Sequence, residues 1–436
     1  MPIFKIAYLP PLLIYASAGV SGLTSIVGIF FIKDFLSLSA AFIASIGFWA
    51  GIPWALKMPI GFLIDRYWNL KQYFVYLGAF LVSISLLIMY GILVHQDTML
   101  HYLEIKTWFI LSSILTPIGY VLQDVVADAM TVEAVEPSFK NITEQVKKNN
   151  TKKEHTIVQL YGRFAIILGS LIVGLINLFI FKGVNENYAN INLLYGKIYL
   201  YALIIPVISI SGIVLFNFLN KNKTKASEFK TTTLDYQIFL GSCIFVIFTV
   251  FFGTLNMPLS REVILISSLG LVAILMRLLI KDLKKEDQYT IVGTAIIIFV
   301  FRAMPSPGAG LNWFEIDILG FNQSFFSVLS ITSALITLIG MVVLRKAMMK
   351  ASLAKLFIVL SILSATLYFP SLFMYYELHQ YTSILTNGLV DAKFIAILNT
   401  AVESPLAQVA MIPMLAWIAK NAPSKYKATF FAVFAS

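Results

Sequence analysis

Two groups of charged side chains lie inside apolar stretches of the sequence, where each charge needs a chemical reason. The first group begins in LQDVVADAMTVE, residues 122–133, where Asp124 and Asp128 are four residues apart. Residues at this spacing share one face of a helix. A charge at the centre of a membrane-spanning helix costs roughly 2.5–3.5 kcal/mol on insertion scales. The two carboxylates therefore require partners or a function.

Lys57 and Arg163 are the expected partners of this acidic face. Lys57 lies eight residues before Asp65, and Asp124 lies nine residues before Glu133, both counted from the same predicted side of the membrane. At about 1.5 Å per residue the two reach a matching depth, and Arg163 enters the same layer. We expect an inner gate layer made of Lys57, Asp65, Arg66, Asp124, Asp128 and Arg163. A static ion-pair network, a gate that breaks and re-forms, and direct contact with a substrate all remain open.

Arg302 and Glu403 start the second group, at mid-depth in two later helices. Arg302 is followed by Pro305, Pro307, Gly308 and Gly310, which remove backbone donors or loosen a helix. Broken helices are tolerated in a membrane only where the freed backbone lines protein or a wet cavity. Glu403 has Pro405 beside it and Asn399 one turn away. A buried pair that fixes packing and a ligand or proton site both remain open, and the candidate site residues are Arg302, Glu403, Asn399, Asn312 and Gln408.

The elements that carry these residues are those of an all-α polytopic membrane protein. The chain has 436 residues, is 59% hydrophobic and 12% charged, and consists largely of apolar runs of about twenty residues. Twelve spans are predicted near Ile6 to Phe31, Leu38 to Phe62, Tyr73 to Val94, Thr107 to Met130, Ile157 to Phe181, Ile198 to Phe218, Tyr236 to Leu255, Val263 to Ile280, Tyr289 to Leu319, Phe325 to Leu344, Leu353 to Tyr375 and Ala392 to Ala419. The closing ATFFAVFAS begins a truncated thirteenth.

The basic residues predict orientation rather than an anionic partner. The net charge is +10, but 23 of the 32 lysines and arginines lie in connections on one side of the predicted spans and six on the other. Such a bias marks the cytoplasmic side. We therefore expect a multi-pass protein of the cell membrane with a cytoplasmic N-terminus, no nucleic-acid partner, and a monomeric state.

Three regions are expected along the chain. Residues 1–219 form an N-terminal six-helix bundle, residues 220–286 a basic linker with two additional helices, and residues 287–436 a C-terminal bundle. A weak repeat supports two bundles on one plan, because a shift of 288 residues lays Lys57 on Arg345. Six, two and six helices would make fourteen, so the given sequence is expected to be about two helices short.

Enzymatic and metal chemistry find no support in the sequence. The single cysteine, Cys243, lies in an apolar run, and the four histidines fall in connections. The glycines of GVSGLTS and GSLIVG lie in apolar helices, which favours helix packing over phosphate binding. We expect no enzyme activity, no cofactor and no metal.

Several of these motifs resemble known transporter families. PWALKMPIGFLIDRYWNLKQ, residues 53–72, is similar to the loop between the second and third helices of the major facilitator superfamily. QDVVADAMTVE, FRAMPSPGAGLNWFEIDILGF and ESPLAQVAMIPMLAWIAKNAPSKYKATFFA together resemble the folate-biopterin transporter family. The resemblance implies a major-facilitator-like two-bundle fold and transport of folate or a pterin by alternating access, driven by protons. For such a substrate, the N–H donors of a pterin ring suit a carboxylate and the carboxylates of a folate tail suit a guanidinium, so we expect Arg302 at an anionic group of the substrate and Glu403 at the pterin edge or carrying the coupling proton.

Two alternatives compete with this interpretation. A related facilitator for muropeptides or acetyl-coenzyme A shares elements of the first half of the sequence, although the second half argues against it. A membrane-embedded transferase would need an acidic or histidine-rich site outside the membrane, and the longest inner connection, VEAVEPSFKNITEQVKKNNTKKEH, has no catalytic arrangement.

Overall fold

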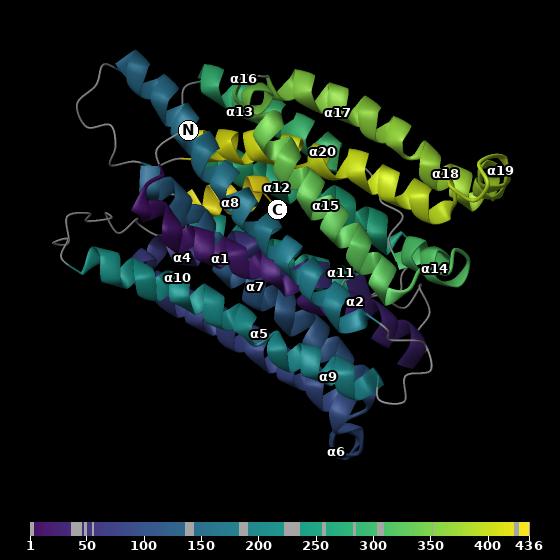
Figure 1. The fold of residues 1–436 in the computed structure, drawn as a ribbon. Helices are drawn as coiled ribbons and strands as arrows, with labels where there is room; N and C mark the ends of the chain where they lie inside the picture. Colours follow the sequence, from purple (N-terminus) through teal and green to yellow (C-terminus); the bar gives the residue numbers. More distant parts are fainter. Residues whose placement is uncertain are drawn as a thin grey trace.

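The fold was examined in a computed structural model that describes residues 4–35, 46–47, 50–54, 56–135, 144–182, 191–221, 236–254, 259–281, 285–302, 309–350, 352–422 and 427–435. Within these residues the regular elements are helices, arranged side by side in two groups (Figure 1). The all-α architecture predicted from the apolar runs is confirmed.

The first group contains the helices coloured purple to teal in Figure 1. The N-terminal span is built from α1, η2, α2 and the π-helical η3, which follow one another without a gap from Leu9 to Phe35. The bounds of the group are α1 Leu9–Val20, η2 Ser21–Thr24, α2 Ser25–Phe30, η3 Phe31–Phe35, α4 Lys57–Arg66, α5 Lys71–Val94, α6 Gln96–Leu100, α7 Ile105–Val135, α8 Glu144–Phe181, α9 Ile191–Tyr201 and α10 Ile204–Asn220.

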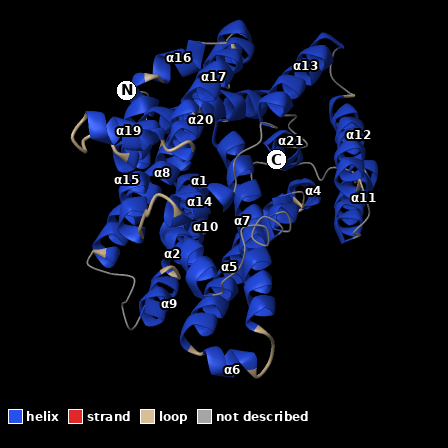
Figure 2. Cartoon of the chain, turned by 90° about the vertical axis from the view of Figure 1, so that its right-hand side faces the viewer, coloured by secondary structure: helices blue, strands red, loops and turns tan. Residues whose placement is uncertain are grey.

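The second group is coloured green to yellow and follows an additional helical pair. The pair, α11 Tyr236–Thr254 and α12 Ser260–Ile280, lies at one edge of the molecule (Figure 2), where α11 contacts α4 and α12 contacts α21. The remaining bounds are α13 Lys285–Arg302, α14 Ala309–Asp317, α15 Gln323–Val343, α16 Arg345–Lys350, α17 Leu353–Leu367, α18 Phe369–Tyr375, α19 Leu378–Leu385, α20 Ala392–Asn421 and α21 Lys427–Ala435.

Nine helices in the described part of the chain are long and apolar enough to cross a membrane. Each coincides with a predicted span, and shorter apolar helices at Phe239–Phe252 and Gln288–Phe301 coincide with two more. The predicted span Leu38 to Phe62 lies partly outside the described residues. The multi-pass character is therefore established, while the count of twelve spans plus a thirteenth remains a prediction.

Small residues allow the helices of the first bundle to approach closely. A Cβ atom placed on Gly78 of α5 would lie 2.5 Å from the carbonyl oxygen of Gly119 on α7, and one placed on Gly19 of α1 would overlap the backbone of Ile166 on α8. Gly169 meets α1 in the same way. The glycines of GVSGLTS and GSLIVG that make these contacts serve helix packing, as the sequence indicated.

A hydrophobic core spans the seam between the two bundles. Met58 and Phe62 of α4 belong to the same buried cluster as Met341 of α15, Leu415 of α20 and Phe431 of α21. Because α8 contacts α1 and α7 on one side and α15 and α20 on the other, it also lies at this seam. We call this boundary between the bundles the seam.

Candidate functional site

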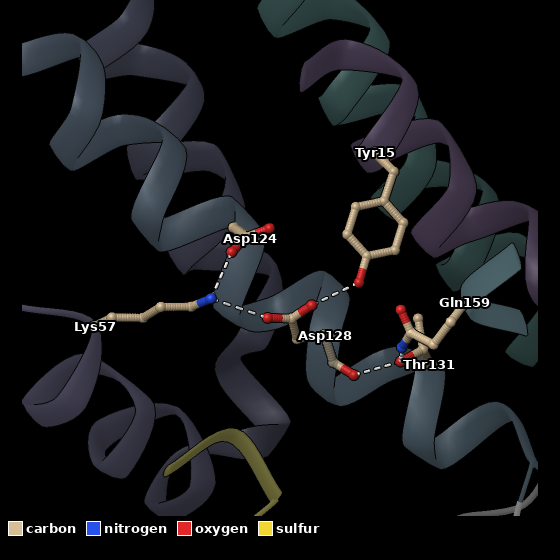
Figure 3. Close-up of polar contacts among 6 residues, drawn as sticks. All are labelled: Tyr15, Lys57, Asp124, Asp128, Thr131 and Gln159. Atoms are coloured by element: carbon tan, nitrogen blue, oxygen red, sulfur yellow. Dashed lines mark hydrogen bonds and ion pairs between the residues drawn. The ribbon is translucent and has the colours of Figure 1, made fainter. Parts of the chain in front are cut away.

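Lys57 lies between the two aspartates of the opening motif. Its Nζ is 2.7 Å from Asp124 Oδ2 and 3.1 Å from Asp128 Oδ2 (Figure 3). The side chain of Lys57 is 3% exposed and that of Asp128 is 5% exposed, whereas Asp124 is 30% exposed. Spacing along the helix thus brought both carboxylates to one cation, with Asp124 as the more accessible member.

Uncharged side chains complete this cluster. The Tyr15 hydroxyl donates a hydrogen bond of 2.6 Å to Asp128 Oδ1, so both oxygens of that buried carboxylate have partners. Thr131 donates to the backbone carbonyl of Asp128 and accepts from Gln159 Nε2 at 3.1 Å. Figure 3 shows these six residues converging from α1, α4, α7 and α8. Buried polar networks of this kind stabilise a structure when their members are satisfied.

The cluster lies within the first bundle and does not cross the seam. Tyr15, Lys57 and Asp128 come from α1, α4 and α7, and Gln159 comes from α8. Removing one partner from a buried ion pair leaves an uncompensated charge, so the arrangement ties the helices of one bundle together. This placement favours the static network over a gate that opens between the bundles.

Asp65, by contrast, connects the two bundles. Its Oδ1 accepts a hydrogen bond from the backbone N–H of Ala428 at 3.0 Å, and its Oδ2 accepts from the backbone N–H and the hydroxyl of Thr429 at 2.8 and 2.7 Å. These amides open α21, where unpaired N–H groups and the positive helix end favour a carboxylate. We call this arrangement the inner contact, after the predicted side on which it lies.

Two further features shape the inner contact. A Cβ atom on Gly61 would lie 2.9 Å from the carbonyl oxygen of Ala428, so only glycine permits the approach of α4 to α21. Asp65 follows the predicted span that ends at Phe62, and burial raises the pKa of its carboxyl to about 6, although hydrogen bonds from Thr429 and Ala428 act to lower it.

The opposite end of the seam is bridged by different residues. Lys33 Nζ lies 2.6 Å from Asp317 Oδ1 of α14, and Gln323 Nε2 of α15 donates to the Tyr195 hydroxyl of α9 at 3.2 Å. The rings of Phe30 and Phe326 meet edge to face nearby, in one cluster with Tyr195. We call the pairs Lys33–Asp317 and Tyr195–Gln323 the outer contact. Polar contacts therefore join the two bundles at both ends of the seam in this structure.

The expected pairing of Arg163 with the acidic face is wrong. Arg163 is half-buried in α8 and forms no ion pair or hydrogen bond with the described residues. The reason is that Lys57 already engages both aspartates, and a shared depth does not fix the direction in which a helical side chain points. Arg66 ends α4, next to Asp65.

The residues of the second candidate site lie mainly along α20. Glu403 is exposed, and Asn399 Nδ2 donates to its Oε2 at 3.5 Å. Asn399 Oδ1 and Gln408 Oε1 are buried acceptors without a hydrogen-bond partner in the described part of the chain. Asn312 is half-buried in α14. The side chain of Arg302 lies outside the described residues, so an Arg302–Glu403 pair remains a prediction.

Several residues of these contacts were not found by reading the sequence. Tyr15, Thr429 and Gln159 carry no charge, so the cost of burying a charge gave no signal for them. Lys33 and Asp317 lie at predicted span ends, where charges are ordinary. Among the described residues, no group of three or more histidine, cysteine, aspartate or glutamate side chains is placed to hold a metal.

The model of the BT1 family matches residues 18–436 of this chain. No curated protein matches it. A solved POT family transporter in complex with a thioalcohol-conjugated peptide is similar, with 15% identity and a TM-score of 0.60 over 98% of this chain and 89% of that chain.

Two solved structures of a sugar transporter show the same fold. The xylose transporter XylE from E. coli, partially occluded and inward open, has 15% identity and a TM-score of 0.51, covering 99% of this chain and 90% of that chain. The major facilitator superfamily proton:xylose symporter XylE bound to 6-bromo-6-deoxy-D-glucose has 16% identity and a TM-score of 0.52, covering 99% and 84%. At this identity the similarity establishes the major-facilitator-like fold and says nothing about substrate.

Proposed function

The chain belongs to the BT1 family, and on that premise we propose that it is a secondary active transporter of folate, biopterin or a related pterin, coupled to protons and working by alternating access. Family and fold are those of transporters, not of enzymes. Pterin specificity rests on the resemblance of its motifs to the folate-biopterin transporters.

One observation carries the transport proposal: different residues join the two bundles at the two ends of the seam. Asp65 holds α21 at the inner contact, and Lys33 holds Asp317 at the outer contact. Alternating access requires one end of a central site to open while the other stays closed, largely by rigid-body movement of the bundles. Separate polar contacts at the two ends are suited to this, since each can break while the other remains.

The chemistry of α20 supports a heterocyclic substrate. A pterin ring presents adjacent N–H donors that a carboxylate accepts in bidentate fashion, which is the role we assign to Glu403 as an alternative to carrying the coupling proton. The free acceptor oxygens of Asn399 and Gln408 are suited to further ring donors. Asn312 is a fourth candidate contact, and the fifth, Arg302, is assigned to an anionic group of the substrate.

The sequence predicts one inner gate made of Lys57, Asp65, Arg66, Asp124, Asp128 and Arg163. We propose that Asp65, whose hydrogen bonds cross the seam, has the gate function, and that Lys57 and the two aspartates stabilise the first bundle.

Uptake by the full-length protein in sealed vesicles tests the proposed function. Labelled folate, biopterin, a muropeptide and acetyl-coenzyme A are offered with and without a proton gradient. Gradient-dependent uptake of folate or biopterin supports the proposal. Selective uptake of the muropeptide or acetyl-coenzyme A would favour the alternative class of facilitator, and uptake of none of the four would contradict both.

The orientation is also proposed, from the excess of basic residues on one side. Single cysteines at Lys148 and at His101, introduced after replacing Cys243, are labelled with a membrane-impermeant maleimide in sealed vesicles of known sidedness. Labelling from opposite sides is expected, with His101 on the external side. Labelling of both positions from one side would refute the topology.

A further inference from the structure

Arg163 is a cation at the seam, and no acidic side chain among the described residues pairs with it. Its helix, α8, contacts α1 and α7 of the first bundle and α15 and α20 of the second. Among the described residues, Arg163 has no ion-pair or hydrogen-bond partner, and it is neither fully buried nor fully exposed. A side chain of this kind needs a counter-charge or contact with water.

The direction of the Arg163 side chain follows from its neighbours on α8. Successive residues of a helix are rotated by about 100°. Gly162 lies against the Tyr15 ring, and Ile166 lies against Gly19, so these positions face α1. Ile167, on the other flank, packs against the buried cluster that contains residues of the second bundle. Arg163 falls between these two directions and therefore points along the seam.

Depth places Arg163 beside the polar cluster rather than at the membrane surface. It lies nine residues after Glu154, which pairs with Lys5 at the inner end of the span, and this corresponds to about 13 Å along the helix. The preceding residue, Gly162, touches the ring of Tyr15, whose hydroxyl binds Asp128. Arg163 is also within electrostatic range of that hydroxyl.

The nearby acids pair with Lys57 rather than with Arg163. Lys57 binds Asp124 and Asp128, and Asp128 uses its second oxygen to accept from Tyr15. Lys57 and Tyr15 thus already donate to the aspartates, whereas the guanidinium of Arg163 has no hydrogen-bond or ion-pair partner among the described residues. A guanidinium presents its N–H donors in a rigid planar fork that matches a carboxylate in bidentate fashion.

We propose that Arg163 binds a carboxylate of the transported solute from the side of the first bundle. The inference rests on the proposed function, for which the carboxylate belongs to the tail of folate. Arg163 thereby fixes the tail, while α20 supplies the acceptors for the ring. A pterin without a carboxylate, such as biopterin, makes no use of this group.

The test compares the two substrates in matched arginine variants. Binding of folate and of biopterin to the purified full-length protein is measured by ligand-induced thermal stabilisation for wild type, Arg163→Gln and Arg163→Lys. Arg277→Gln is the control, because it removes the same charge from an exposed position on α12. The melting temperature without ligand shows whether each variant folds.

We expect Arg163→Gln to weaken folate binding on the order of 10- to 100-fold, the factor for one lost hydrogen-bonded charge, and to leave biopterin binding unchanged. Arg163→Lys should recover part of the folate affinity, since it restores the charge without the fork. Arg277→Gln should bind both ligands as the wild type does.

Other outcomes separate this proposal from the proposed function. Equal folate affinity in wild type and Arg163→Gln, or equal losses for folate and biopterin, would overturn the role of Arg163 while leaving pterin transport intact. If the wild type binds neither folate nor biopterin, the proposal of pterin specificity is wrong. Binding of the muropeptide is then measured for the wild type and the same variants. Loss of muropeptide binding in Arg163→Gln alone supports the carboxylate site, and unchanged or absent binding overturns it.

Discussion

Asp65 and Thr429 are 364 residues apart in the sequence, yet two hydrogen bonds of 2.8 and 2.7 Å join them across the seam. The carboxylate acts as a cap for a helix of the other bundle, which satisfies N–H groups that would otherwise be unpaired. Movement of α4 away from α21 must break these bonds. The inner contact is thus a polar closure that can be opened at modest cost.

Asp65 variants should change the opening of this contact in a graded and pH-dependent way. Capping interactions are typically worth about 1 kcal/mol, so Asp65→Ala should raise hydrogen exchange at the Ala428 and Thr429 amides about fivefold. Asp65→Asn, which keeps an acceptor oxygen, should lie near wild type. Exchange measured by mass spectrometry at fixed pH checks this order.

The pH dependence follows from the pKa of Asp65, which burial raises from an ordinary 3.8 to about 6. Relative to an open state with the ordinary pKa, the closed contact is most stable below about pH 4, and this contribution is lost as the pH rises towards 6. After correction for intrinsic exchange, opening should increase across this window and then level off. A similar step in Asp65→Asn would show that another group titrates.

The buried cluster around Lys57 predicts strongly coupled substitutions. Lys57→Ala leaves two adjacent carboxylates without their cation, and loss of one partner from a buried pair costs about 3–5 kcal/mol. Asp124→Asn should cost less, because Asp124 is partly exposed and Asp128 keeps its contact with Lys57. In a double-mutant cycle, Lys57→Ala with Asp124→Ala should be less damaging than the sum of the single changes. Strict additivity in the denaturation midpoint would rule out the pair as an energetic unit.

Sequence reasoning located this pair correctly for a simple geometric reason. The rise per residue and the predicted span ends fixed the depths of Lys57 and Asp124, and the spacing of four residues placed Asp128 on the same face. Depth alone does not fix the direction in which the Arg163 side chain points. The predicted pairing of Arg163 with the aspartates was therefore wrong. The fold class and nine span positions followed in the same way from hydropathy.

The contacts across the seam could not be predicted from the sequence, because they depend on the order in which helices pack. Nothing in the local sequence connects Asp65 with Thr429 or Lys33 with Asp317, whose partners lie in the other bundle. Tyr15 was missed because a tyrosine in an apolar run is ordinary, and its significance appears only when its hydroxyl meets Asp128.

The outer contact predicts a charge-swap result at Lys33 and Asp317. Because Asp317 is half exposed, the pair should contribute no more than about 1 kcal/mol. Lys33→Asp alone should place two acids together and shift the protein towards opening at that end by up to about fivefold. Lys33→Asp combined with Asp317→Lys should reverse the shift. Solvent access to a cysteine at Phe326 reports the opening, and equal access in the single and double variants would exclude direct pairing.

Glu403 and Arg302 provide the test that separates substrate binding from proton coupling. Glu403→Gln keeps the shape of the side chain and cannot ionise, so a coupling role predicts that gradient-driven uptake is lost while exchange of substrate persists. A role in binding the pterin ring predicts that both are lost, because the amide cannot accept two N–H donors from one edge. Arg302→Ala should weaken binding of a carboxylate-bearing substrate if Arg302 also contacts it.

The measurements are uptake under an imposed proton gradient and counterflow without one, with Asn399→Ala as a neighbouring variant that leaves the carboxylate in place. Normal affinity and normal proton dependence in both Glu403→Gln and Arg302→Ala would assign these two residues to packing within the second bundle.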